Sequence, residues 1–356
     1  VLLPFDGPLR GALQQAGAQA EVRPELPLIT RQRFTSVAGL LGFARDARRC
    51  AIALRDVLDA FRPDVVHTNN TTVLAAYAGE LRRRGIPHLW HVRESFAEFR
   101  LLWPLLRRYI LTHADRVLCV SAAVAAQFGG HPAVEVLHNG FPRAEFARIT
   151  ASDAQVFRRA HGLEGRTCVG VAGRLKLKRK GQETFLRAAS ALRARFPDAR
   201  FLLIGSPFPG NEAHETALRQ LAGELGLGDA AVFTGDAPDH LAALAALDVV
   251  VLSSGLPEPF GGVVVEAMAL GRPVVGTNIG GTPEQIEDGV TGLLVPPNEP
   301  EALAAAIGRL LDNPAQAARM GEAGRARFLA RFEFDPFFAR LLARYQTLAD
   351  RRGAPR

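Results

Sequence analysis

Two carboxylates bracket one unusual stretch of the chain, residues 255–271, which reads GLPEPFGGVVVEAMALG. Glu258 and Glu266 flank a Pro-Phe-Gly-Gly turn and three valines. Because proline and paired glycines interrupt helices, we expect Glu258 on a loop and a helix that starts near Gly262 and carries Glu266 in its first turns. The unpaired N–H groups of a helix start can bind phosphate or hydroxyl oxygens, and a carboxylate such as Glu266 suits the diol of a ribose. Taken alone, either glutamate could instead be an ordinary surface or helix residue.

A run of cations lies in a second stretch, VAGRLKLKRKGQE, at residues 171–183. Gly173 and Arg174 come directly after a predicted strand. Four more basic residues precede the next glycine: Lys176, Lys178, Arg179 and Lys180. Several cations on one strand-to-helix connection would bind a di- or triphosphate. A solvated basic loop is the alternative, because short Lys/Arg clusters are nonspecific.

Strand-like and amphipathic helical runs alternate along the chain, a pattern typical of parallel α/β architecture. In the first half the predicted strands are 63–68, 87–92, 116–121 and 134–139. In the second half they are 167–173, 200–206, 230–235, 248–254, 273–278 and 291–297. Their Val, Ile and Leu content suits sheets covered on both faces, so we predict two Rossmann-like, doubly wound domains. Ligands of such sheets bind beyond the carboxyl ends of the strands, where both candidate stretches lie.

The alternation loosens around residues 141–165, where we place the domain boundary. The predicted parts are an N-terminal domain at 1–150, a second domain at 151–335, and a C-terminal helix at 336–356 that packs back on the first domain. The chain starts within a strand-like run and without an initiator Met. We therefore expect the natural protein to have more sequence at its N-terminus.

The composition, 48% hydrophobic and 22% charged, is typical of a soluble globular protein. Residues 1–150 hold 19 Arg, no Lys and 13 acidic residues, and so carry most of the net charge of +7. This excess suits an anionic substrate or membrane surface, whereas no nucleic-acid-binding motif is recognisable. The three cysteines lack metal-ligand or disulfide spacing, and no apolar run reaches the roughly 18 residues of a membrane span. We expect a cytoplasmic protein.

The Glu-x7-Glu stretch resembles that of the retaining glycosyltransferases of family 4, which have the GT-B fold. Two further motifs follow it in the family order, Gly280-Gly281-x-x-Glu284 and Asp288-Gly289-x-x-Gly292. The segments PDVVHT, His91-Val-Arg-Glu94, ADRVLCVS, Asn139-Gly140, GRL…KG and FTG precede it in that order. The resemblance thus extends over nearly the whole chain, and the ordered set is far more specific than any single motif.

The resemblance implies an interdomain cleft in which the second domain holds most of a nucleotide-sugar donor. The residues expected to bind the donor are Gly173, Arg174, Lys180, Val232, Phe233, Glu258, Phe260, Gly261, Gly262 and Glu266. Arg174 and Lys180 would bind the diphosphate, Glu266 the ribose and Glu258 the transferred sugar. Backbone N–H groups of 260–262 would hold sugar hydroxyls or phosphate, and the side chains at 232 and 233 would border the base.

Four residues are expected to take part in transfer: His91, Arg174, Lys180 and Glu258. His91 would face the donor sugar, whereas His67, His113 and His138 are interpreted as structural. The GRL-to-KG spacing is one residue longer than in many family members, so Lys178 or Arg179 could replace Lys180. The first strand and glycine-rich turn with which the resembled family usually starts are absent before Val1. Because that turn normally helps to shape the acceptor site, we expect weak or no transfer without it.

The family mechanism retains the anomeric configuration and needs no metal, and no Asp-x-Asp motif is present. The substrates implied are a UDP- or GDP-linked sugar and a saccharide or lipid-linked acceptor, in cell-surface glycan synthesis, with no cofactor. A non-catalytic nucleotide-sugar binding protein and another GT-B enzyme, such as an epimerase or phosphorylase, are the alternatives. A nicotinamide-dependent oxidoreductase is disfavoured because no G-x-G-x-x-G follows a predicted strand.

The segment FAEFRLLWPLLRRYI, at 96–110, interleaves apolar residues with Arg100, Arg107 and Arg108. Such a helix could dock peripherally on an anionic membrane at the inner face of the plasma membrane. The alternative, which we favour slightly, is an amphipathic helix whose apolar face packs on the sheet.

Overall fold

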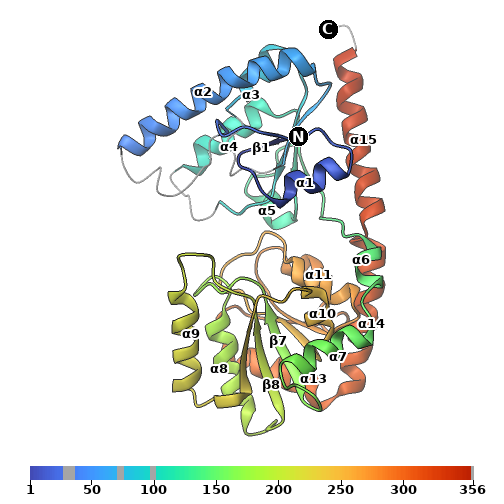
Figure 1. The fold of residues 1–356 in the computed structure, drawn as a ribbon. Helices are drawn as coiled ribbons and strands as arrows, with labels where there is room; N and C mark the ends of the chain where they lie inside the picture. The colour runs from blue at the N-terminus through green and yellow to red at the C-terminus, as the bar shows by residue number, and fades with distance from the viewer. Residues whose placement is uncertain (27–36, 70–75, 97–101, 354–356) are drawn as a thin grey trace. The chain divides into compact units, whose positions relative to one another are not determined.

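The computed structural model describes residues 1–26, 37–69, 76–96 and 102–353, and its chain divides into two compact units (Figure 1). Unit 1 comprises Val1–Val120, Val124–Leu137 and Arg340–Arg356. Unit 2 comprises Ser121–Ala123 and His138–Ala339. From the sequence we placed the boundary at residue 150, whereas the contacts divide the chain at Leu137/His138. The helices within the loosened pattern of 141–165 belong to unit 2, which explains the difference.

Unit 1 is built on a parallel sheet in the order β3-β4-β5-β6. Its strands are β3 (Val66–Thr68), β4 (His88–Val92), β5 (Arg116–Cys119) and β6 (Val134–Val136). A separate parallel pair joins β1 (Leu2–Leu3) to β2 (Glu21–Val22). The described helices in this part of the chain are α1 (Pro8–Gln15), α2 (Val37–Phe61), α3 (Ala78–Arg83), α4 (Trp103–His113) and α5 (Ala122–Ala126). The side chains of β4 are all buried, as expected for a central strand covered on both faces.

Unit 2 is built on a six-stranded parallel sheet in the order β12-β11-β10-β7-β8-β9. Its strands are β7 (Thr167–Ala172), β8 (Ala199–Ile204), β9 (Ala231–Gly235), β10 (Val249–Leu252), β11 (Val274–Thr277) and β12 (Leu293–Val295). Counted from β7, this is the doubly wound order 3-2-1-4-5-6. The strand order reverses between β7 and β10, which are paired neighbours. The carboxyl ends of these two strands therefore mark the place where such folds bind ligands.

Helices cover both faces of the unit 2 sheet (Figure 1). They are α6 (Arg143–Ala147), α7 (Ala151–Ala160), α8 (Gln182–Arg193), α9 (Ala213–Glu224), α10 (His240–Ala245), α11 (Gly262–Ala269), α12 (Thr282–Gln285), α13 (Pro300–Asp312) and α14 (Pro314–Arg331), with a 3₁₀ turn at Gly228–Ala230. Alternate side chains of each strand enter opposite cores. Val169 and Val171 pack with residues of α8, α9 and α13, while Cys168 packs with residues of α7, α10 and α11.

All ten strands expected from the sequence are present, nine of them within the predicted range, while β8 starts one residue earlier, at Ala199. The predicted parallel α/β architecture with two Rossmann-like domains is thus confirmed, and unit 2 has the doubly wound strand order. The 25-residue helix α2 was not among the expected elements. The last helix, α15 (Phe334–Gly353), spans both units, and its residues from Arg340 onward belong to unit 1. There Arg344 Nε donates to Glu135 Oε1 at 2.7 Å.

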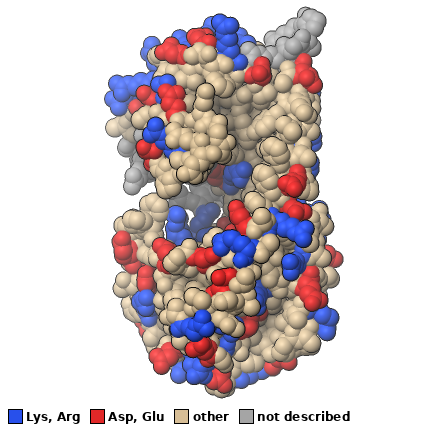
Figure 2. Space-filling view, turned by 45° about the vertical axis from the view of Figure 1, so that its right-hand side comes forward, with Lys and Arg blue, Asp and Glu red and all other residues tan. Residues whose placement is uncertain are grey.

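Acidic and basic side chains are interspersed over both units on the face drawn in Figure 2. None of the helices in the described ranges combines the length and apolarity needed to cross a membrane. In the membrane-docking candidate, residues 97–101 lie outside the described residues. Within α4, Arg107 donates to the carbonyl oxygen of Phe128 at 2.7 Å and Ile110 is buried, while Leu105 is exposed. Membrane contact stays a prediction.

Candidate functional site

Two loops meet at the carboxyl ends of β7 and β10 in unit 2. The first loop, residues 173–181, carries the cations, and the second, residues 253–261, carries Glu258. Ser253 Oγ donates to the carbonyl oxygen of Lys180 at 3.1 Å, and Gly255 N donates to that of Arg179 at 3.1 Å. Gly181 has φ +64°, and a Cβ there would lie 1.7 Å from Ser253 O. The close approach of the two loops therefore requires glycine at this position.

An ion pair joins the two loops at the centre of this candidate site. Lys180 Nζ lies 2.7 Å from Glu258 Oε1, and Ser254 Oγ donates to the same carboxylate oxygen at 3.1 Å. Glu258 is only 8% exposed, whereas about a third of the Lys180 side chain is exposed. As predicted, Glu258 lies on a loop. It comes close to the cation loop because the strands that precede the two loops, β10 and β7, are neighbours in the sheet.

The three candidate diphosphate cations differ in position. Lys178 is exposed and has φ +64°, and its backbone N–H donates to Glu183 at the start of α8. The backbone carbonyl of Arg179 accepts two N–H groups of the opposite loop, those of Gly255 and Leu256. Lys180 alone among these three has a described side-chain contact with Glu258. Which of the three residues meets a diphosphate stays a prediction.

Helix α11 begins at Gly262, as the sequence predicted, and Val264 and Val265 are fully buried in the core. Val263 is only partly buried. The carboxylate of Glu266 points back along the helix, because a Cβ on Gly262 would lie 3.7 Å from Glu266 Oε1. With no side chain at Gly262, Glu266 reaches the end of α11 where the first N–H groups lack helical acceptors. An anion and a diol can thus be bound side by side.

His240, at the start of α10, is the neighbour of Glu266. Its Nε2 lies 3.8 Å from Glu266 Oε2. The Glu266 carboxylate raises the pKa of His240 above its ordinary value, with a smaller contribution from Asp239. Asp239 caps α10 by accepting from the N–H groups of Leu241 and Ala242. Glu266 therefore faces a histidine that gains a proton more readily than usual.

Arg174, directly after β7, is exposed and lies over an aromatic ring. Its guanidinium carbon is 4.7 Å from the ring centroid of Phe208, on the loop that follows β8. Pro207 and Pro209 flank Phe208, whose side chain is 53% exposed. The Phe208 ring thus provides a cation–π contact for Arg174. Gly173 is exposed with φ +134°.

The residues expected to border a base, Val232 and Phe233, are partly buried on β9. Arg219 of α9 lies over the Phe233 ring at 4.4 Å. The ring of Phe260 packs among His138, Phe141 and Phe332, which anchors the loop before α11.

Gly261 is also part of this anchored loop, because its carbonyl oxygen accepts from Gln285 Nε2 at 3.0 Å. Glu284, from the family motif, accepts from the N–H groups of Ala122 and Ala123 and lies 2.9 Å from His138 Nε2. These contacts tie segments of unit 2 together.

His91, on β4 of unit 1, is fully buried. Its ring stacks on that of His67 at 5.6 Å, and Arg93 Nη2 lies 3.5 Å from its Nδ1. Because a guanidinium can only donate, Nδ1 accepts and the neutral ring carries its proton on Nε2. Within the described residues, that Nε2 has no hydrogen-bond partner. Burial, followed by the charge of Arg93, lowers the pKa of His91 to about 2, so the ring is an uncharged donor. Contact with a donor sugar stays a prediction.

Three residues of this site were not foreseen: Ser254, Phe208 and His240. Each follows a strand of the unit 2 sheet, so the rule used for the other candidates could have flagged them. Their partners lie 4, 34 and 26 positions away in the sequence, and only the first of these pairs is local. In the part of the chain that is described, no three His, Cys, Asp or Glu side chains gather as a metal site would require.

Comparison with known families gives two adjacent matches. Residues 13–145 match the model of Glycosyltransferase Family 4, and residues 153–327 match that of Glycosyl transferases group 1. Among curated relatives, a GDP-mannose-dependent alpha-(1-6)-phosphatidylinositol monomannoside mannosyltransferase of Mycolicibacterium smegmatis is 36% identical over 259 residues, covering 69% of this chain and 65% of the relative. A D-inositol 3-phosphate glycosyltransferase of Corynebacterium urealyticum is 32% identical over 254 residues, covering 68% and 59%. The alignments thus span less than two thirds of these relatives.

Solved structures give a longer match. HepE of Anabaena, in complex with UDP, superposes with a TM-score of 0.83 at 25% identity, covering 98% of this chain and 91% of that chain. Sucrose-phosphate synthase of Thermosynechococcus elongatus superposes with a TM-score of 0.77 at 25% identity, covering 98% and 94%. Together with the two Rossmann-like sheets, these similarities confirm the predicted GT-B fold.

Proposed function

This chain belongs to the GT-B glycosyltransferases that join a Family 4 segment to a group 1 segment, and from that premise we propose that it transfers a sugar from a nucleotide-sugar donor to a saccharide or lipid-linked acceptor. The observation that carries the proposal is the position of Lys180, Glu258 and Ser254. They lie where the unit 2 strand order reverses, on the two loops that follow β7 and β10.

The chemistry follows from the charge that the leaving group acquires. The bond between the anomeric carbon and the diphosphate oxygen breaks, and a bond to the acceptor oxygen forms on the same face, with retention. The acceptor hydroxyl gives its proton to the departing diphosphate. Arg174, Lys180 and the N–H groups at the start of α11 stabilise the negative charge, so no metal is required. Glu266 binds the ribose diol, Glu258 the transferred sugar, and His91 contributes its Nε2–H as a hydrogen-bond donor.

The donor base and sugar have two supported alternatives. The curated relatives include enzymes named for GDP-mannose, whereas the HepE structures contain UDP or UDP-glucose. The names of these relatives contain phosphatidylinositol monomannoside and inositol 3-phosphate. We therefore propose an anionic or lipid-linked polyol or saccharide as the acceptor, used at the cytoplasmic face of the membrane in glycoconjugate synthesis.

A thermal-shift panel tests the donor site, because a ligand that binds only the folded state raises the unfolding midpoint. The panel comprises UDP, GDP, UDP-glucose and GDP-mannose, with the full chain, Glu266→Ala and the surface control Glu301→Gln. We expect at least one nucleotide to raise the midpoint of the wild type and of Glu301→Gln, and to have a much smaller effect on Glu266→Ala.

Absence of any shift, or equal shifts in all three proteins, would contradict the donor site. Release of nucleoside diphosphate from the donor then separates a transferase from a non-catalytic binding protein. A non-catalytic nucleotide-sugar binding protein would bind the donor but would neither transfer the sugar nor slowly hydrolyse the donor.

A further inference from the structure

The Lys180–Glu258 ion pair occupies the place where the proposed function needs two separate contacts. Lys180 is required by the donor diphosphate and Glu258 by the donor sugar, yet in the structure they lie 2.7 Å apart and neutralise each other. Ser254 Oγ contributes one more hydrogen bond to the same oxygen of Glu258. A ligand phosphate must therefore draw Lys180 away from a carboxylate that is almost buried.

The two partners differ in how firmly they are held. The backbone of Glu258 is fixed, because its carbonyl oxygen accepts from Gly281 N at 2.8 Å. A Cβ on Gly280, which has φ +63°, would lie 2.3 Å from the same carbonyl oxygen. Lys180 instead carries its charge at the end of a flexible four-carbon stem with three N–H donors. When a phosphate binds, we expect Lys180 to turn toward it while Glu258 stays in place.

The consequence for Glu258 depends on what else the ligand brings. A nucleotide-sugar supplies hydroxyl groups that replace Lys180 as hydrogen-bond donors to the carboxylate. A nucleoside diphosphate brings no sugar at that position. Of its side-chain partners among the described residues, the buried carboxylate then keeps only Ser254. An almost buried carboxylate that loses its cation is unfavourable, and this cost falls on the diphosphate alone.

We propose that Glu258 competes with the nucleoside diphosphate for Lys180, with Ser254 as a positioning residue for the carboxylate, and that this competition makes the site prefer the donor over the spent product. The inference rests on the proposed function. It assigns to the pair a second role, which is to weaken product binding after the sugar has left.

Calorimetric titration of the full chain with UDP and with GDP tests the competition. Glu258→Gln keeps the shape and a hydrogen-bond acceptor but removes the charge, so we expect the nucleoside diphosphate to bind about tenfold more tightly than to the wild type. The same variant should bind the matching nucleotide-sugar no more tightly. Glu301→Gln, an exposed acid on α13, is the matched control and should behave as the wild type.

Ser254→Ala should change diphosphate affinity in the opposite direction from Glu258→Gln. Without the hydroxyl group, Glu258 depends on Lys180 alone, so the diphosphate should bind several-fold more weakly. A general loosening of the site would move both variants in the same direction, whereas the competition moves them in opposite directions. Unchanged or weaker diphosphate binding by Glu258→Gln overturns the inference. If neither nucleotide nor nucleotide-sugar binds the wild type, the proposed function fails as well.

Discussion

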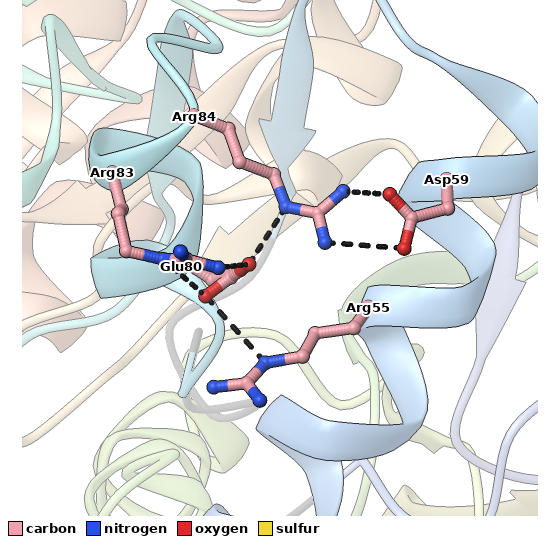
Figure 3. A network of polar contacts seen from close by, with 5 residues as sticks. All are labelled: Arg55, Asp59, Glu80, Arg83 and Arg84. Carbon is pink, nitrogen blue, oxygen red and sulfur yellow. Dashed lines mark hydrogen bonds and ion pairs between the residues drawn. The ribbon is translucent and has the colours of Figure 1, made fainter.

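Two nearly buried glutamates, one in each unit, have very different partners. Glu80, on α3 of unit 1, and Glu258, in unit 2, are both 8% exposed. Figure 3 shows Glu80 among arginines: Arg83 donates to both of its oxygens at 2.5 and 3.1 Å, and Arg84 donates at 2.7 Å. Glu258 has one lysine and one serine, and both contact the same oxygen, Oε1.

These different partners indicate that Glu80 is a structural carboxylate, whereas Glu258 is suited to binding a ligand. Arginine forks bind carboxylates with fixed geometry, and a third arginine, Arg55 of α2, lies 3.6 Å from Glu80. This network, extended by the Arg84–Asp59 pair, fastens α3 to α2 (Figure 3). Among the described residues, Glu258 has one flexible cation, and both of its side-chain contacts are to Oε1. The burial of a carboxylate therefore does not by itself identify a ligand-binding site. A partner that can move from the carboxylate to a ligand is the better indicator.

The largest effect is expected at the exchangeable pair. Lys180→Gln should lower kcat/KM for the donor by about 10²-fold or more, because it removes one cation that stabilises the leaving diphosphate. Lys178→Gln, two residues earlier on the same loop, should change it by less than about threefold. Steady-state kinetics with nucleoside diphosphate release as the readout checks both. A larger loss in Lys178→Gln would transfer the diphosphate role to that residue.

Acid should weaken unit 1 through its buried histidines. Burial, as the main cause, lowers the pKa of His67 and of His88 to about 4. Between pH 6.5 and about 4 the unfolded chain therefore binds protons that the native unit does not, and stability falls as the pH falls. Each imidazole adds about 1.4 kcal/mol per pH unit to the slope within this window.

Urea unfolding at several pH values, followed by tryptophan fluorescence, measures this slope. Both tryptophans of the chain, Trp90 and Trp103, lie in unit 1, so the signal reports on that unit. His67→Gln should have a shallower pH dependence than the wild type across pH 4–6.5. An unchanged slope would mean that His67 is protonated in the native unit.

Glu80→Gln should lower the stability of unit 1 without changing the affinity of the protein for nucleotides. Hydrogen bonds from Arg83 and Arg84 lower the pKa of Glu80 to about 2, so its stabilising effect is complete above about pH 4.5 and is lost as the pH falls through about 2. We expect the variant to lower the fluorescence-detected Tm by about 2–4 °C at pH 7 and by less at pH 3. Nucleotide affinity should stay at the wild-type value. A clear loss of affinity would contradict the contrast between the two glutamates.

The smallest effect concerns His240. Because Glu266 raises its pKa, His240 should titrate above its ordinary value of 6.5 in NMR spectra, and its ion pair is lost as the pH rises through the raised pKa. Glu266→Gln should return the midpoint toward the ordinary value. Equal midpoints in both proteins would mean that the two side chains do not interact in solution.

Local patterns predicted more of the fold than of the site. Strand positions followed from short Val, Ile and Leu runs, and the start of α11 followed from Gly261 and Gly262. The domain boundary was less accurate, because helical periodicity does not show which sheet a helix packs on. The resemblance of ordered motifs correctly indicated the GT-B fold, whereas the roles of the individual residues remain predictions.

The sequence by itself determined the parallel α/β class, the loop that carries Glu258 and the helix that carries Glu266, since these depend on residues close together in the chain. Only the tertiary structure decided that Lys180 pairs with Glu258, 78 positions away, and that Phe208 faces Arg174. It also decided that Ser254 holds the same carboxylate as Lys180. The physical reason is strand order: β7 and β10 become neighbours through hydrogen bonds between distant segments, and local sequence patterns do not specify that pairing.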